Sequence, residues 1–383
     1  MRINFNIFTK NKQIIIFFLL IFIIKIIIYT KNNYSKKNIL LKGRYYLDRC
    51  LNGELLNKNI YKYFKYPKIA IVIPVYNCQN SIKYSIRSIQ NQNFIQIEII
   101  LVNDNSNDNS LKLIKIIQKE DKRIQIINNK KNMGTLYSRC IGVLESSAKY
   151  IFPLDNDDLF FNKDIFNIIY KEAENYNYDI IGFQHVQAYN YSANINEMKN
   201  GCHMHNYNFK VVQPELSLFG ISKGNKLIIR EVHIWSKSIK TSIYKKAINA
   251  LGKIRYSLFL SYAEDTSMLF ILFNSAKSYR YIAKYGIFRF NRRDSASSIM
   301  PKSIMLFGEI FLSDIIFDFT KNDFKSKKFA FYKSLQIKKS ILFKALNKNN
   351  KYFLIRLLKK ILSCQYINNK DKKKIKKEYK DFI

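Results

Sequence analysis

The sequence predicts an α/β domain with a mostly parallel sheet over about residues 67–300. Apolar runs of strand length alternate with helix-like segments after Pro67, as in consecutive βαβ units. Residues 69–73 form a continuous apolar run, which suits a strand buried on both faces of a sheet. Polar clusters follow the ends of several predicted strands, where open α/β sheets bind their ligands.

The predicted elements of this domain alternate strictly. The strands are the apolar runs at 69–73, 97–102, 124–127, 150–154 and 179–183. The helices carry apolar residues three or four positions apart and cover 81–91, 110–119, 135–147 and 164–175. This alternation predicts a sheet covered by helices.

The composition allows a large core and gives no support to a nucleic-acid-binding role. Apolar residues make up 48% of the 383 residues, which excludes a globally disordered chain. The formal net charge is +37, but lysine is spread along the whole chain instead of forming one basic stripe. Asparagine, isoleucine and tyrosine are enriched together with lysine, so the charge reflects a general compositional bias.

The cysteines show no redox or metal motif. They are widely spaced and odd in number, which argues against a fully paired disulfide framework. They stand at positions Cys50, Cys78, Cys140, Cys202 and Cys364. The stretch Cys-His-Met-His at 202–205 lacks a second ligand cluster at zinc spacing, so it is interpreted as ordinary loop.

The N-terminus carries a candidate membrane anchor. After a short tail at 1–13, residues 14–29 are apolar except for Lys25, whose long side chain can reach the membrane interface. No small-residue cleavage site follows, which favours an uncleaved signal-anchor in a single-pass protein. Residues 30–66 are polar and tyrosine-rich and are predicted to be a stem.

The C-terminal region, residues 301–383, is predicted to be helical with a basic tail. Its charge run at 368–382 is interpreted as a solvated helix. An electrostatic contact with anionic lipid is the alternative.

An acidic cluster, Asp155-Asn156-Asp157-Asp158, follows the strand predicted at 150–154. Asp155 and Asp157 could hold a hard cation such as Mg²⁺ or Mn²⁺ and leave coordination sites for diphosphate oxygens. Adjacent carboxylates repel one another, and a cation would relieve that repulsion. The alternative is a polar turn that caps the next helix.

Seven segments together resemble one known family. They lie at 71–77 (IVIPVYN), 102–110 (VNDNSNDNS), 132–143 (NMGTLYSRCIGV), 150–158 (YIFPLDNDD), 234–244 (IWSKSIKTSIY), 263–270 (AEDTSMLF) and 288–298 (FRFNRRDSASS). In this order and spacing the chain resembles the family 2 glycosyltransferases of GT-A fold. The resemblance implies a GT-A domain at 67–300, with a Rossmann-like nucleotide-binding sheet.

The resemblance implies a nucleotide-sugar site. The nucleoside pocket would be lined by Pro74, Val75, Tyr76 and Asn77. Asp104 matches the residue that hydrogen-bonds the base, typically uracil, although Asn103 stands where many members carry a second aspartate. Arg139 matches an arginine near the nucleotide, a suitable partner for phosphate charge.

The same resemblance assigns the carboxylates. Asp155 would contact the ribose side, Asp157 would coordinate the metal, and Asp158 is a secondary candidate. Glu264-Asp265 matches the family's Glu-Asp pair, in which Asp265 is the expected catalytic base. The alternative for this pair is a first-turn acidic pair that favours the helix dipole.

Other residues are candidates for the acceptor or the diphosphate. Trp235 and Lys237 could shape the acceptor side, and the alternative for Trp235 is core packing. Arg289, Arg292 and Arg293 could stabilise the departing diphosphate, or could be solvated surface residues.

The resemblance thus implies a membrane-anchored, metal-dependent, inverting glycosyltransferase that moves a hexosyl or N-acetylhexosaminyl group. The donor would be a nucleotide sugar of the UDP type, and the acceptor a hydroxyl on a glycan, protein or lipid. A lumenal domain in the Golgi or endoplasmic reticulum is the implied location, whereas a count of the basic residues on either side of 14–29 by the positive-inside rule would place the domain in the cytoplasm. Two alternatives stay open: a sugar nucleotidyltransferase, and a non-catalytic carbohydrate-binding protein on the same fold.

Overall fold

The computed structural model describes four main stretches of the chain, at 37–52, 63–188, 233–252 and 263–290. It also describes short stretches at 199–200, 209–211, 219–221, 227–229 and 369–378, and single helical or turn positions at 305, 308, 312, 315, 355, 358, 359, 362, 363 and 380. The predicted anchor at 14–29, the 202–205 stretch, Arg292 and Arg293 lie outside the described residues. Among the helices that the structure describes, none has the length and apolar character to cross a bilayer. The anchor therefore stays a prediction.

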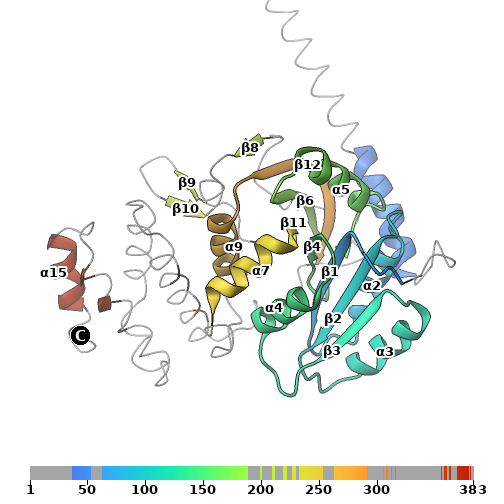
Figure 1. Cartoon of the computed structure of the whole chain (residues 1–383), viewed down its shortest axis with the longest axis horizontal. Helices are drawn as coiled ribbons and strands as arrows, with labels where there is room; N and C mark the ends of the chain where they lie inside the picture. The colour runs from blue at the N-terminus through green and yellow to red at the C-terminus, as the bar shows by residue number, and fades with distance from the viewer. Residues whose placement is uncertain are drawn as a thin grey trace, which may run out of the picture.

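One large sheet organises the domain, with strand order β3-β2-β1-β4-β11-β6-β12-β5 (Figure 1). Its strands are β1 (Ile69–Val75), β2 (Ile97–Asn103), β3 (Ile124–Asn128), β4 (Tyr150–Pro153), β5 (Leu159–Phe160), β6 (Ile180–Ala188), β11 (Lys237–Lys240) and β12 (Tyr279–Phe290). Two short strands extend it, with β7 (Lys199–Asn200) on β6 and β8 (Phe209–Val211) on β12. A separate pair is formed by β9 (Phe219–Ile221) and β10 (Leu227–Ile229).

The helices follow the predicted alternation. They are α2 (Ile82–Gln90), α3 (Ser110–Glu120), α4 (Thr135–Glu145), α5 (Ile165–Tyr176), α7 (Thr241–Leu251), α9 (Glu264–Ser275) and α15 (Asn369–Glu378). The predictions for α2 to α5 and for β1 to β4 and β6 are confirmed, with most ends within two residues. All seven residues of β1 are buried, as its continuous apolar run predicted.

The first half of the sheet is parallel and the second half is mixed. β1 pairs in parallel with β2 on one side and with β4 on the other. The chain therefore reverses its direction of winding at β1, and ligands bind at such a switch point in open α/β sheets. β11 runs antiparallel to both β4 and β6. The prediction of a mostly parallel sheet thus holds for the first half of the domain, whereas β11 and β5 depart from it.

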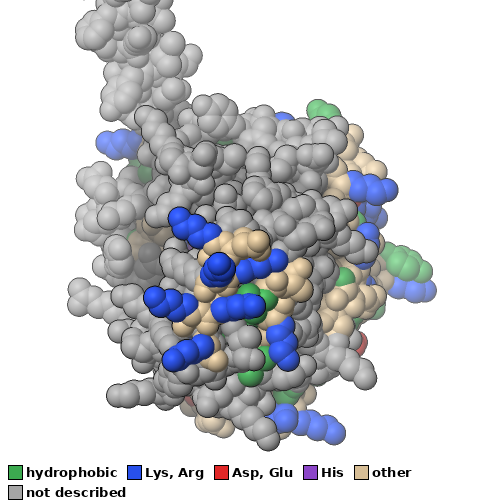
Figure 2. Space-filling model, turned by 90° about the vertical axis from the view of Figure 1, so that its left-hand side faces the viewer, with side chains coloured by type: hydrophobic (Ala, Val, Ile, Leu, Met, Phe, Trp, Pro, Cys, Tyr) green, Lys and Arg blue, Asp and Glu red, His purple; other side chains and the backbone are tan. Residues whose placement is uncertain are grey.

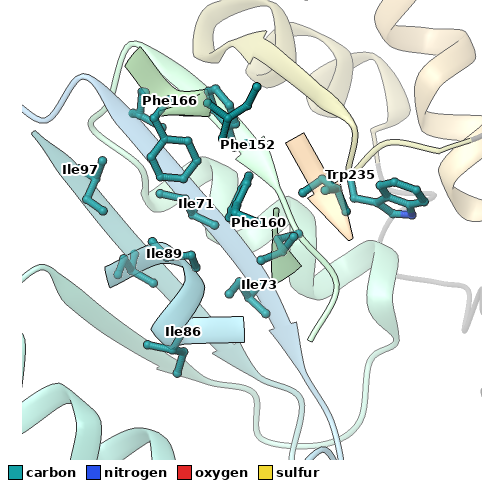
Figure 3. Close-up of a cluster of buried hydrophobic side chains, with 14 of the residues drawn as sticks. Ile71, Ile73, Ile86, Ile89, Ile97, Phe152, Phe160, Phe166 and Trp235 are labelled. Atoms are coloured by element: carbon teal, nitrogen blue, oxygen red, sulfur yellow. The ribbon is translucent and has the colours of Figure 1, made fainter. Parts of the chain in front are cut away.

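Both faces of the sheet are covered. Alternate residues of β1, including Ile71 and Ile73, pack with α2 and α5 in one apolar cluster (Figure 3). The opposite face meets α4 at Gly142, where a Cβ atom would lie 2.5 Å from Cγ1 of Val72. Only glycine allows α4 to lie this close to β1. On that face α4, α7 and α9 contact one another (Figure 1).

A helix at 37–51 occupies part of the predicted stem. Its residues Leu40, Tyr46, Leu47 and Cys50 are buried against Leu159, Phe161, Val186 and Phe288. The Tyr46 hydroxyl donates a hydrogen bond of 2.6 Å to the carbonyl of Ser88 in α2. This helix therefore packs directly on the domain, against β5, the strand that follows the acidic cluster.

Leu47→Ala is expected to lower the free energy of unfolding by about 2–5 kcal/mol, because it leaves a cavity at a fully buried position. Leu41→Ala is the matched control, since Leu41 lies on the same helix and is 45% exposed. It should change the free energy by about 0.5 kcal/mol or less. Urea denaturation followed by circular dichroism measures both values. Equal effects would show that helix 37–51 does not pack on the domain in solution.

The basic tail forms α15, which confirms the predicted helix at the charge run. Its described lysines are mostly exposed. They include Lys370, Lys373, Lys376 and Lys377. Figure 2 views the molecule from the side on which α15 lies in Figure 1, and Lys and Arg side chains gather on this face.

Candidate active site

The loops that follow β1, β2 and β4 are tied together at the carboxyl edge of the sheet. The backbone N–H of Asp104, after β2, donates to the carbonyl of Val75 at 2.8 Å. The side-chain amide of Asn156, in the acidic cluster, donates to the carbonyl of Pro74 at 3.0 Å. Three polar clusters that the sequence placed at strand ends therefore meet at one edge.

The loop after β1 is held by the loop after β2. Asn77 accepts from the N–H of Asn107 at 2.9 Å and donates its own N–H to the Ser106 hydroxyl at 3.2 Å. Its φ of 45° lies in the left-handed region, which asparagine tolerates better than most residues. Of the four predicted pocket residues, Pro74 and Val75 are buried, while Tyr76 and Asn77 are exposed at the edge.

Asp104 is 3% exposed and accepts three hydrogen bonds. The donors are the Asn129 amide at 2.7 Å and the backbone N–H groups of Met133 at 2.8 Å and Gly134 at 2.7 Å. Gly134 is the residue before α4 and has φ 88°, so the carboxylate lies at the positive end of that helix. Asp104 thus fixes the start of α4 at the predicted nucleotide edge.

Arg139, on α4, joins two carboxylates that lie far apart in the sequence, Asp155 and Asp265. Its Nη1 donates to Oδ1 of Asp265 at 2.7 Å, and its Nη2 donates to Oδ1 of Asp155 at 2.9 Å. The Arg139 side chain is 1% exposed, whereas those of Asp155 and Asp265 are 35% and 17% exposed. Sequence reasoning placed Arg139 beside phosphate charge; in the structure its charge is shared by two carboxylates.

Asp265 reaches this position from the start of α9. The helix begins after Ala263, whose φ of 59° is in the left-handed region and costs a non-glycine residue about 1–3 kcal/mol. The Ala263 carbonyl accepts from the backbone N–H of Ser267 at 2.9 Å and from its hydroxyl at 2.8 Å. Backbone strain of this kind is often found at functional sites.

The two carboxyl groups at the start of α9 are shifted toward neutrality. Burial, followed by the nearby charge of Asp265, raises the pKa of Glu264 to about 8. Burial also raises the pKa of Asp265, although Arg139 opposes this shift. Burial alone would lower the pKa of Arg139, but Asp265 and Asp155 hold it above its ordinary value, so this guanidinium stays charged. The direct contact with Arg139 favours the charged form of Asp265, whereas burial and the charge of Asp265 favour the neutral form of Glu264.

The acidic cluster offers oxygen ligands at the same edge. Asp155 and Asp157 are partly exposed, while Asp158 is buried and accepts from the N–H of Phe290 at 3.3 Å. Burial, and then the charges of Asp157 and Asp155, raise the pKa of Asp158 well above its usual range. Within the described stretches, three or more His, Cys, Asp or Glu side chains do not come together as a ready metal site. A cation here would need ligands from water or substrate as well.

Trp235 and Lys237 lie inside the protein. Trp235 is 2% exposed and stacks on the ring of His233, with centroids 4.7 Å apart. Lys237 is fully buried, and its Nζ donates to the His233 carbonyl at 3.0 Å and the Ser236 hydroxyl at 3.1 Å. This burial favours the core-packing alternative over direct contact with an acceptor.

Arg289 is partly exposed and lies beside Trp235. Its guanidinium carbon lies 5.7 Å from the centroid of the Trp235 ring. Its charge opposes the rise in the pKa of Asp158. Sequence reasoning missed His233, whose pKa falls to about 2, first through burial and then through the charge of Arg289. A single histidine outside any motif carries no signal that would identify this neighbour of Trp235.

The family model and the similar proteins all point to glycosyltransferases. Residues 70–234 match the model of glycosyl transferase family 2. An uncharacterized glycosyltransferase of Rickettsia bellii is 41% identical over 120 residues, which are 31% of this chain and 17% of that protein. The GalNAc(5)-diNAcBac-PP-undecaprenol beta-1,3-glucosyltransferase of Campylobacter jejuni is 32% identical over 111 residues, 29% of this chain and 36% of that protein. The chain thus matches less than half the length of each of these relatives.

Solved structures show the same fold. S. aureus TarS 1–349 in complex with UDP-GlcNAc has a TM-score of 0.56 at 16% sequence identity, over 79% of this chain and 82% of that chain. Longer S. aureus TarS has a TM-score of 0.55 at 13% identity, over 82% of this chain and 54% of that chain. At this level of identity the similarity is one of fold.

Proposed function

We propose that the chain transfers a sugar from a nucleotide sugar to an acceptor hydroxyl, through the domain whose residues 70–234 match glycosyl transferase family 2. The observation that carries the proposal is the contact of Arg139 with both Asp155 and Asp265. Asp155 follows β4 at the nucleotide edge, and Asp265 is the expected base. Both carboxylates bind one guanidinium, which supports a single site that holds the proposed donor side and the proposed catalytic base.

The chemistry is an inverting displacement. Asp265 accepts the proton of the acceptor hydroxyl as that oxygen attacks the anomeric carbon of the sugar. A bond forms between the acceptor oxygen and the anomeric carbon, and the bond from that carbon to the diphosphate breaks. Burial raises the pKa of Asp265, which brings this base closer to neutral pH and favours proton transfer. Protonated Glu264 leaves a single negative charge on the pair.

The proposed donor is a UDP-sugar. Support comes from Asp104, a buried carboxylate beside the N-terminus of α4, and from the fold shared with a protein solved with UDP-GlcNAc. A lipid-linked or free glycan is the proposed acceptor class, by analogy with the undecaprenol-linked substrate named for the Campylobacter relative. Asp104 would accept a hydrogen bond from the uracil ring of the donor. A carboxylate has about four acceptor sites, and three of those of Asp104 are used within the protein.

Asp157 and Asp155 fit a divalent metal that is held partly by substrate. Mg²⁺ is typically bound through one or two carboxylates together with phosphate oxygens and water. Two partly exposed carboxylates at the nucleotide edge meet that requirement, and a larger protein cluster is not needed. When bound, Mg²⁺ or Mn²⁺ would offset the charge of the diphosphate.

Removing metal with EDTA is expected to abolish sugar transfer, and added Mn²⁺ or Mg²⁺ should restore it. Asp157→Asn should lower kcat by about 10²-fold, since one charged ligand is lost from the site. Asp48→Asn is the control. It also removes the charge of one partly exposed carboxylate, but in the helix at 37–51, far from Asp157 in the sequence. Coupled detection of released UDP measures all four conditions. Full transfer by the metal-free protein would remove the metal from the mechanism.

A donor screen tests the function itself. The chain is incubated with a panel of nucleotide sugars and Mn²⁺, and released nucleoside diphosphate is measured with and without glycan acceptors. Slow release from a UDP-sugar is expected, and it should increase with a matching acceptor. A sugar nucleotidyltransferase would instead form nucleotide sugar from a sugar phosphate. Tight binding without turnover would support a carbohydrate-binding protein and reject the transferase.

A further inference from the structure

Arg139 contacts the base and the donor-side carboxylate through different nitrogen atoms. Nη1 binds Asp265 from α9, and Nη2 binds Asp155 from the turn after β4. A guanidinium is planar and presents its N–H groups in a rigid fork. One planar group therefore sets the position of Asp265 relative to Asp155, although 126 residues separate Arg139 from Asp265 in the chain.

Burial leaves Arg139 little surface for a substrate. The side chain is 1% exposed, whereas both carboxylates reach the surface in part. The two acids are therefore more accessible to a substrate than the arginine that they bind. A group in this position acts on the reaction through its neighbours.

We propose that Arg139 is a positioning residue, which holds Asp265 and Asp155 in one fixed geometry and does not bind the diphosphate. This inference rests on the proposed transferase function. It assigns Arg139 a different role from the phosphate contact that the family resemblance implies. Without the guanidinium, two negatively charged groups would face each other in a partly buried site, and both would move or take up protons.

The two roles of Arg139 predict opposite kinetic changes. A positioning residue affects the chemical step, so Arg139→Gln should lower kcat and leave the affinity for UDP nearly unchanged. A phosphate ligand affects binding of the donor, so its loss should raise the Kd of UDP and the KM of the sugar nucleotide. Small displacements of a reacting group can cost about 10²-fold in rate.

The experiment compares Arg139→Gln, Arg139→Lys and Arg123→Gln with the wild-type chain. We expect Arg139→Gln to lower kcat by about 10²-fold while the Kd of UDP, measured by calorimetry with Mn²⁺, stays within about threefold. Arg139→Lys should recover only part of kcat, because an ammonium group lacks the fork that reaches both acids. A Kd of UDP that rises more than about tenfold with kcat retained would overturn the proposal.

Arg123→Gln is the matched control. Arg123 is also buried and also paired, with Nε and Nη2 bound to Asp121 at 3.0 and 2.9 Å. It lies between α3 and β3, away from the acidic edge. Its loss should lower stability and leave kcat and the Kd of UDP unchanged. A fall in kcat as large as that of Arg139→Gln would show that the effect is merely one of stability.

A second readout does not depend on turnover. Thermal unfolding midpoints are measured for Arg139→Gln, Asp265→Ala, which removes the acceptor of the Arg139 hydrogen bond, and the double variant, with Arg139→Lys in place of Arg139→Gln if the latter does not fold. Positioning through a direct contact predicts non-additive shifts, and additive shifts would overturn it. If the donor screen finds no turnover, the proposed function fails, whereas this cycle still decides whether Arg139 holds Asp265.

Discussion

Asp265→Asn is expected to lower kcat for sugar transfer by about 10²- to 10⁴-fold while the Kd of UDP stays within about threefold. The substitution removes the proton acceptor and keeps the size of the side chain. The amide oxygen of asparagine can still accept the hydrogen bond that Arg139 Nη1 donates to Oδ1 at 2.7 Å. The fold and the nucleotide edge should therefore persist, and the loss should fall on the chemical step.

The measurement is UDP release in the presence of acceptor, together with calorimetric titration of UDP. Glu264→Gln serves as the comparison, since Glu264 is next in sequence and is protonated at neutral pH. It should lose less activity than Asp265→Asn. Near-normal turnover of a folded Asp265→Asn variant would reject Asp265 as the base, and a larger loss in Glu264→Gln would move that role to Glu264.

The kcat of the wild-type chain should also fall at low pH. The base must be deprotonated to act, so kcat falls as pH drops through the pKa of Asp265. Because burial raises that pKa, the fall should begin at a higher pH than for an exposed aspartate.

Asp104→Ala is expected to lower the free energy of unfolding by about 3 kcal/mol, because it leaves buried hydrogen-bond donors without an acceptor. The donors are the Asn129 amide and the N–H groups of Met133 and Gly134. The same change should weaken UDP binding by more than about tenfold, since the start of α4 borders the proposed nucleoside pocket.

Urea denaturation and UDP titration measure the two effects separately. Asp108→Ala is the control, because Asp108 lies in the same loop between β2 and α3 and also accepts from backbone N–H groups, those of Gln79 and Ser110. Asp108 is only partly buried, so its loss should cost about 1 kcal/mol. Wild-type affinity for UDP in a folded Asp104→Ala variant would remove Asp104 from the nucleotide site.

The first half of the fold could be predicted because its signals are local and long. β1 to β3 are apolar runs of five to seven residues, and the helices between them repeat their apolar residues at helical spacing. β5 and β11 have only two and four residues, which is too short for a readable period. Their antiparallel pairing depends on contacts with distant strands, which no local pattern records.

The helix at 37–51 was missed for a different reason. Its buried face includes Gly43, whose Cβ position is occupied by the ring of Phe161, and Cys50. Neither residue gives the strong apolar signal that a helical period needs. Exposed Ile39 and Leu41 further blur that period.

The places of the candidate residues in the fold could be predicted, whereas the contacts between them could not. Asp104, Asp155 and Asp265 stand in recognisable segments, and the structure places each at the expected element end. The role of Arg139 depends on two side-chain contacts made across three elements. The sequence made Trp235 and Lys237 candidates for the acceptor side, with core packing as the alternative for Trp235, and only the packing shows that both are buried.

The most direct test of this site is the anomalous-difference map of a crystal grown with UDP and Mn²⁺. We expect one manganese peak within bonding distance of the Asp157 carboxylate, with diphosphate oxygens completing its coordination and the uracil beside Asp104. Manganese or UDP bound away from the edge formed by Asp104, Asp155 and Asp157 would contradict it.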